Sequence, residues 1–294
     1  MKILKIILSL LIISVTVIVT YNLVKGLSFD FLEYLEEKYH FLFLTLITQI
    51  FGVYFSSKRW RHCVESYNEG KKILFSFDTF FFLNARANII NNFLPSILFG
   101  DLSKLISPNK SRVNKKTELK FIFIDRIIGV FTLLNFGLVS SVYLGLISIN
   151  FLFCLILLQI IFFIFLRRLD RNFLKIQSII FFIKKLPTFN VFIFSFFSQL
   201  FFSISLFIQI YAFKESLSSL KDLFTSIFLN FMGIVPFSIN GWGVREWSAA
   251  RISIDSFDHD ILIISSIIFG ICFSISNLLI FIYTSINKDS KLKS

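Results

Sequence analysis

Charged side chains within or beside apolar stretches are the residues of this sequence best suited to chemistry. Four are basic and three are acidic: Arg86, Lys104, Arg126, Arg245, Asp101, Asp125 and Glu246. A guanidinium can hold a phosphate with two hydrogen bonds. A charge at membrane depth is costly unless it is paired or faces water. We therefore expect the basic residues to bind a phosphate-bearing ligand and the acidic residues to balance their charge while the site is empty.

The first charged stretch, residues 73–98, carries a polar stripe. Its asparagines fall at positions i, i+4, i+7 and i+8, which share one face of a helix: Asn84, Asn88, Asn91 and Asn92. The stripe has two interpretations, hydrogen bonding between helices or the lining of a polar cavity. Arg86 in the same stretch favours the cavity, because an isolated guanidinium is costly in lipid.

The chain is broken directly after this stripe. We expect Pro95 to end the helix and Gly100 to allow a tight backbone turn. Asp101 and Ser103 then have two interpretations: they cap a short helix, or they form with Lys104 a phosphate site at a helix N-terminus.

A second broken stretch covers residues 223–247. Gly241 and Gly243 permit backbone shapes closed to other residues and expose N–H groups that can bind an anion. Trp242 and Trp247 are either interfacial anchors or parts of the site. Across the two broken stretches, seven residues are expected at the tips: Asn92, Pro95, Gly100, Pro236, Ser238, Gly241 and Gly243.

Asp125 and Arg126 begin a strongly apolar run. Adjacent residues point about 100° apart on a helix, so the two side chains do not face each other. We expect each of them to pair with a residue of another helix, and Asp101 with Arg126 is one candidate pair.

The composition predicts an all-α integral membrane protein, with residues 1–294 forming a single polytopic domain. The chain is 55% hydrophobic and 16% charged, with a mean hydropathy of +0.78, whereas soluble domains carry about 25% charged residues. A membrane helix needs about 20 apolar residues. Six full spans are predicted: Ile6–Val24, Phe41–Phe55, Phe121–Leu144, Leu146–Leu166, Val191–Phe213 and Ile261–Tyr283. The sequence leaves no stretch for a soluble catalytic domain.

The loop charges predict the topology. The net charge of +12 is concentrated in short loops, which fits the positive-inside rule and contact with anionic lipid rather than nucleic acid. Lys58–Lys72, Lys104–Lys120 and Arg167–Lys185 are therefore expected in the cytoplasm, as are both termini. The two broken stretches, about residues 73–103 and 223–251, would then each enter and leave on one face as re-entrant segments. This order predicts inverted repeat units at 1–144 and 146–284.

Three sequence elements together resemble the lysylphosphatidylglycerol synthase transmembrane family, the flippase-like domain also found at the N-terminus of bacterial multiple-peptide-resistance factors. They are the run from Asn92 to Lys104, the start Asp125-Arg126-Ile127-Ile128-Gly129, and the run from Pro236 to Glu246. The resemblance implies a domain of the bacterial cytoplasmic membrane that moves a lipid between leaflets. The soluble aminoacyltransferase domain of the full-length resistance factors has no counterpart here, so aminoacyl transfer is not expected.

The lead hypothesis is a flippase-like transporter for an anionic phospholipid or a polyprenyl-linked glycolipid, with no cofactor and no metal. No ATP-binding GxxxxGK[ST] motif occurs in the sequence. Two alternatives remain open. One is a membrane-embedded transferase that uses Asp101, Asp125 or Glu246 on a lipid-linked substrate. The other is a non-catalytic partner of a glycosyltransferase, or of another envelope-biosynthesis protein, docked through the basic cytoplasmic loops.

Overall fold

The computed structural model describes residues 31–67, 76–93, 97–105, 115–168, 188–214, 219–234, 241–252 and 258–292. These ranges are helical and contain no β-strand, which confirms the all-α membrane fold. The helices are α2 (Phe31–Tyr67), α3 (Phe77–Phe93), α4 (Ile97–Ser103), α5 (Lys115–Tyr143), α6 (Ile149–Arg168), α8 (Thr188–Lys214), α9 (Leu220–Met232), α10 (Val244–Ala249) and α11 (His259–Leu292).

Helices α2, α5, α8 and α11 are long and apolar enough to cross a membrane. Their candidate spans are Glu36–Glu65, Glu118–Tyr143, Phe189–Lys214 and His259–Ile286, at the places of four predicted spans. The predicted span Leu146–Leu166 corresponds to α6, which has a shorter apolar part at Ile149–Gln159. The predicted span Ile6–Val24 lies outside the described residues. The protein is therefore a multi-pass membrane protein.

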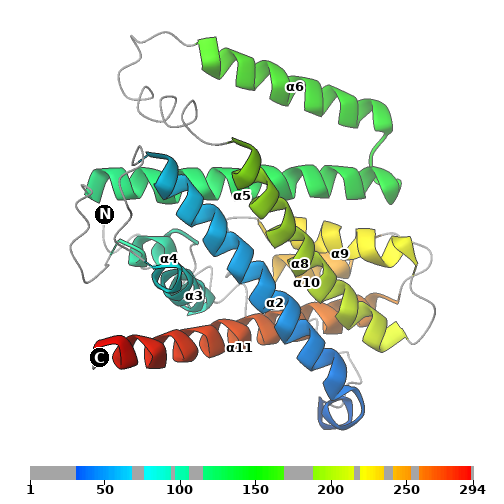
Figure 1. Cartoon of the computed structure of the whole chain (residues 1–294). Helices are drawn as coiled ribbons and strands as arrows, with labels where there is room; N and C mark the ends of the chain where they lie inside the picture. Colours follow the sequence, from blue (N-terminus) through cyan, green and yellow to red (C-terminus); the bar gives the residue numbers. More distant parts are fainter. Residues whose placement is uncertain are drawn as a thin grey trace, which may run out of the picture.

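Both broken stretches consist of two short helices in place of one long span. The first is α3 followed by α4, and the second is α9 followed by α10. Figure 1 shows α2 and α8 crossing the centre of the molecule, with α3 and α4 on one side and α9 and α10 on the other. Pro95, Pro236 and Ser238, which were expected to break these helices, lie outside the described residues.

Each of the two broken stretches packs against helices from both halves of the chain. Helix α3 packs on α2 and on α11, while α9 packs on α8 and on α5. Each broken stretch thus contacts the second span of its own half and the last span of the other half. An inverted repeat would produce this matching set of helix contacts in the two halves. The repeat at 1–144 and 146–284 stays a prediction.

Polar hydrogen bonds and small residues hold the central helices together, as is usual between membrane helices. Ser198 of α8 donates a hydrogen bond to the carbonyl oxygen of Gly52 in α2, at 2.9 Å. Further along the same pair, Gln209 donates to the Thr45 hydroxyl at 2.6 Å. Gln49 joins α2 to α11 by donating to the carbonyl oxygen of Phe269 at 3.0 Å.

Gly100 differs from its expected role. It lies inside α4 rather than at a tight turn, and its backbone N–H donates to Oδ1 of Asn91 at 2.8 Å. A Cβ atom at this position would lie 2.1 Å from the carbonyl oxygen of Ala87. Gly100 is therefore what lets α4 lie directly on α3.

Gly100→Ala is expected to destabilise the protein by about 1–3 kcal/mol, because a backbone atom opposes the added methyl group. Thermal unfolding of the purified protein in detergent measures the effect. Leu102→Ala on the exposed side of the same helix is the matched control and is expected to have a much smaller effect. Equal melting temperatures for Gly100→Ala and the wild type would contradict the close contact.

Candidate functional site

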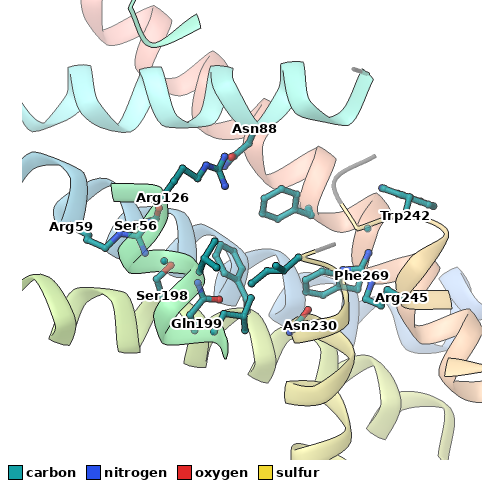
Figure 2. Close-up of a pocket in the computed structure, with 18 residues that line it drawn as sticks. Ser56, Arg59, Asn88, Arg126, Ser198, Gln199, Asn230, Trp242, Arg245 and Phe269 are labelled. Atoms are coloured by element: carbon teal, nitrogen blue, oxygen red, sulfur yellow. The ribbon is translucent and has the colours of Figure 1, made fainter. Parts of the chain in front are cut away.

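A cavity of about 190 Å³ lies among the central helices and is lined from both halves of the chain. Figure 2 shows its polar and aromatic lining. Helices α2, α3, α5 and α8 supply Ser56, Arg59, Asn88, Arg126, Ser198 and Gln199. The segment from α9 to α11 supplies Asn230, Trp242, Arg245, Phe269, Gly270 and Phe273. Three arginines thus line one cavity.

Arg126 lies at the first-half end of the cavity and is held by Asp101 of α4. Its Nε and Nη2 atoms both donate to the carboxylate, with Nη2 at 3.1 Å from Oδ1. Lys104 approaches the same carboxylate, its Nζ 3.0 Å from Oδ1 and 4.9 Å from the centre of the Trp60 ring. The expected Asp101–Arg126 pair is present, and Asp101 carries two cations rather than one.

Asp125 pairs with Arg59, a residue that sequence reasoning did not single out. The Nε of Arg59 lies 2.7 Å from Oδ1 and its Nη2 lies 3.2 Å from Oδ2, while Nη1 donates to Ser195 at 3.0 Å. Arg59 had been assigned to a cytoplasmic loop, but α2 continues well past the predicted span. The signal in the sequence is Gly52, Ser56 and Arg59 at positions i, i+4 and i+7, on one helix face.

Arg245 lies at the second-half end of the cavity. Its Nε donates to the Ser266 hydroxyl at 2.8 Å and lies 3.7 Å from Oε1 of Glu246. Its guanidinium carbon lies 4.5 Å from the centre of the Phe269 ring. Glu246 is fully buried and accepts hydrogen bonds from the Gly243 N–H and from Ser266, both at 2.6 Å. Ser266 and Glu246 thus hold the Arg245 side chain in position in the cavity wall.

The turn before α10 places Trp242 in the cavity wall. Gly241 and Gly243 have φ values of +90° and +84°, which other residues rarely adopt. The Trp242 ring packs on Gly270 of α11, where a Cβ atom would lie 2.6 Å from the ring. Trp247, in contrast, is exposed. Trp242 is therefore part of the candidate site, whereas Trp247 lies at the surface.

The asparagine stripe of α3 bonds to neighbouring helices. Asn84 donates to Ser57 at 3.0 Å, Asn88 to Oδ1 of Asn277 at 2.9 Å and Asn92 to Ser274 at 3.0 Å, and Asn91 accepts from Gly100. Asn88 also lines the cavity. All four asparagines of the stripe thus form hydrogen bonds between helices, and Asn88 alone among them also lines this cavity.

Of the four basic residues expected to bind phosphate, the structure brings two to the cavity. Arg126 and Arg245 line it, while Arg86 and Lys104 do not. Arg86 donates from Nη2 to the carbonyl oxygen of Ser103, at the end of α4. Ser103 itself lies at the end of α4 and donates to the carbonyl oxygen of Gly100.

The ion pairs around the cavity leave an excess of positive charge. The cations are Arg59, Lys104, Arg126 and Arg245, and the anions are Asp101, Asp125 and Glu246. Charges interact more strongly in such a setting than in water, because the surrounding medium has a lower dielectric constant. The arrangement can therefore attract an anion and hold it by hydrogen bonds.

Comparison with known protein families gives one match over most of the chain. The model of the lysylphosphatidylglycerol synthase TM region matches residues 3–254, which include α2 to α10 but not α11. Comparisons with curated proteins and with solved structures give no significant match. Because the family model covers well over half of the chain, this multi-pass membrane protein belongs to the lysylphosphatidylglycerol synthase TM region family.

Proposed function

We propose that this protein is a flippase-like transporter of the bacterial cytoplasmic membrane, with both termini in the cytoplasm. Its substrate is an anionic phospholipid or a polyprenyl-linked glycolipid, which it moves between the two leaflets. The observation that carries the proposal is the cavity lined by Arg59, Arg126 and Arg245 from both halves of the chain. Membership of a lipid-related membrane family supports the same class of substrate.

The size of the cavity supports a headgroup site rather than a whole-lipid site. Pockets for drug-sized molecules have volumes of about 300–1,000 Å³. The cavity here, at about 190 Å³, is smaller and suits a phosphate with a small attached group. The acyl or prenyl chains would stay in the surrounding lipid while the headgroup crosses.

The positions of the arginines support a path between the leaflets. Arg126 and Arg245 lie on helices of opposite halves and at opposite ends of the cavity in Figure 2. In the proposed mechanism the phosphate meets one of them after the other, as the two halves rock about the central α2–α8 pair. A gradient, or downhill exchange of lipids, drives the movement.

Leaflet exchange in vesicles tests the proposal. The purified protein is placed in vesicles that contain a phosphatidylglycerol with a fluorescent label on one tail, and a membrane-impermeant quencher then reports the label in the outer leaflet. We expect the protected fraction to fall far faster than in protein-free vesicles. An unchanged rate, with the protein folded and inserted, would refute transport of this lipid class.

The carboxylates do not favour the transferase alternative. Both oxygens of Asp101, Asp125 and Glu246 already accept hydrogen bonds from, or pair with, groups of the protein. Asp258 and Asp260, the acidic pair around His259, are exposed at the start of α11 and away from the cavity. The same vesicles discriminate, because formation of a new lipid product without leaflet exchange would indicate an enzyme.

A further inference from the structure

Helix α5 lines the cavity with one face and is exposed on the next. Its lining residues fall at positions i, i+3, i+4 and i+7, which share one helix face: Arg126, Gly129, Val130 and Leu133. Its exposed apolar residues include a second set at i, i+4 and i+7: Phe123, Ile127 and Val130. Val130 belongs to both sets, since it lines the cavity and is also 42% exposed. The cavity therefore reaches the surface of the protein at Val130.

This opening lies at the depth of the lipid chains. The candidate span of α5 runs from Glu118 to Tyr143, and Val130 is at its centre. A helix rises 1.5 Å per residue, so each end of the span is about 18–20 Å from Val130 along the helix axis. The hydrocarbon core of a bilayer extends only about 15 Å to either side of its midplane. The cavity thus opens at Val130 toward hydrocarbon rather than toward water.

Helix α9 closes the same side of α5 two turns further along. Gly137 comes seven residues after Val130 and so lies on the same helix face. The ring of Phe231 packs on Gly137 and leaves no room for a Cβ atom there. One further contact continues the closed seam, because Tyr143 stacks on Phe224 with ring centres 4.0 Å apart. Helix α9 ends one residue after Phe231, so the end of α9 forms one edge of the opening.

The groups around the opening change from charged to apolar toward the surface. Arg126 lies one turn from Val130 and lines the cavity, and its side chain is 35% exposed. Ile234, just after α9, adds an apolar side chain to the lining. Outside the cavity, the same side of α5 presents the exposed side chains of Phe123 and Ile127. This order suits a lipid with its phosphate inside the cavity and its chains directed outward.

We propose that the cavity opens sideways into the membrane at Val130, and that a hydrocarbon chain of the substrate lies in this opening while the arginines bind the phosphate. This inference rests on the proposed function and adds the position of the chain. Transfer of a hydrocarbon chain into a polar cavity would be unfavourable, because it separates the chain from an apolar environment. An opening at chain depth removes this obstacle, since only the headgroup has to enter.

The first test fills the opening with a larger side chain. Val130→Trp adds an indole ring where the wild-type side chain already reaches the surface. We expect leaflet exchange of tail-labelled phosphatidylglycerol to fall at least about tenfold, because the chain no longer fits beside α5. Thermal unfolding in detergent shows whether the variant is folded like the wild type.

Val139→Trp is the matched control. Val139 is 48% exposed on the same helix but does not line the cavity. It lies nine residues after Val130, which places it about 180° around the helix. We expect its exchange rate to stay within about twofold of the wild type. Wild-type exchange by a folded Val130→Trp, or an equal loss in both variants, would overturn the inference and leave transport standing.

The second test detects the chain in the opening without any transport. A photoreactive benzophenone amino acid replaces Val130 or, as the control, Val139. Each protein is mixed with tail-labelled phosphatidylglycerol or with diacylglycerol, which has the same chains and no phosphate. At position 130 we expect phosphatidylglycerol to cross-link at least about threefold more than diacylglycerol, because the arginines hold its phosphate nearby. At position 139, which faces bulk lipid, we expect equal cross-linking of the two lipids.

The two tests separate failure of the opening from failure of the transport function. Equal cross-linking of the two lipids at position 130 would overturn the inference. The same preference at positions 130 and 139 would also overturn it. Preferential cross-linking at position 130 alone, in a protein that exchanges no lipid between leaflets, would uphold the opening and refute transport instead.

Discussion

Replacing Arg245 by alanine is expected to reduce lipid exchange to the rate of protein-free vesicles. The guanidinium lines the second-half end of the cavity, where the Ser266 hydroxyl holds its Nε. Arginine binds phosphate through two parallel hydrogen bonds, so alanine removes both the charge and the geometry. The measurement is the exchange rate per inserted protein, with protein levels compared to the wild type.

This variant is also expected to lose stability, because the buried carboxylate of Glu246 loses its counter-charge. Glu246 keeps its hydrogen bonds from the Gly243 N–H and from Ser266 when Arg245 is removed. Arg251→Ala is the matched control, because Arg251 is exposed and packs on the Trp247 ring at 4.7 Å, outside the cavity. Wild-type exchange by Arg245→Ala, or an equal loss in Arg251→Ala, would contradict the assignment of the site.

Replacing Asp125 by alanine is expected to have the largest effect on stability, a loss of about 3–5 kcal/mol. The change leaves the Arg59 guanidinium buried, with the Ser195 hydroxyl as its remaining hydrogen-bond partner in the described structure. A buried charge without a counter-charge is far more costly than the loss of an exposed pair. Unfolding of the purified protein in mixed micelles by increasing amounts of a denaturing detergent measures the difference.

Two further variants make this prediction specific. Glu65→Ala breaks the Arg61–Glu65 pair, whose side chains are about one third exposed, and is expected to cost less than about 1 kcal/mol. The double variant Asp125→Leu with Arg59→Met removes both buried charges and is expected to recover most of the stability. If the double variant were as unstable as Asp125→Ala, packing rather than the uncompensated charge would be the cause.

Much of the fold could be predicted because the signals are local. Runs of apolar residues identified the four long helices, and the charges and glycines identified the two broken stretches. Helix ends were less predictable, as α2 shows. Its apolar run stops near Phe55, but the helix continues to Tyr67, and Arg59 within this extension is neutralised by Asp125, more than sixty residues away. That pairing depends on how two helices pack, which composition does not reveal.

The candidate site was predictable in its residue types more than in its geometry. Arg126 and Arg245 reach the cavity, and Asp101 holds Arg126 as expected. Arg86 was expected beside them, yet it points to the end of α4. Asn230 was not predicted as a site residue, because a single asparagine in an apolar helix forms no recognisable sequence pattern. It nevertheless lines the cavity, at the place where α9 meets the other central helices.

The shared carboxylate of Asp101 has a consequence for movement of the phosphate. A ligand that draws Arg126 away from Asp101 does not leave a bare anion in the membrane, since Lys104 remains 3.0 Å from the same carboxylate. Among the described residues, the Arg59–Asp125 pair has no second cation of this kind, and its separation would leave both charges uncompensated. Arg126 can therefore change partners at modest cost, while Arg59 stays in place as a fixed positive charge.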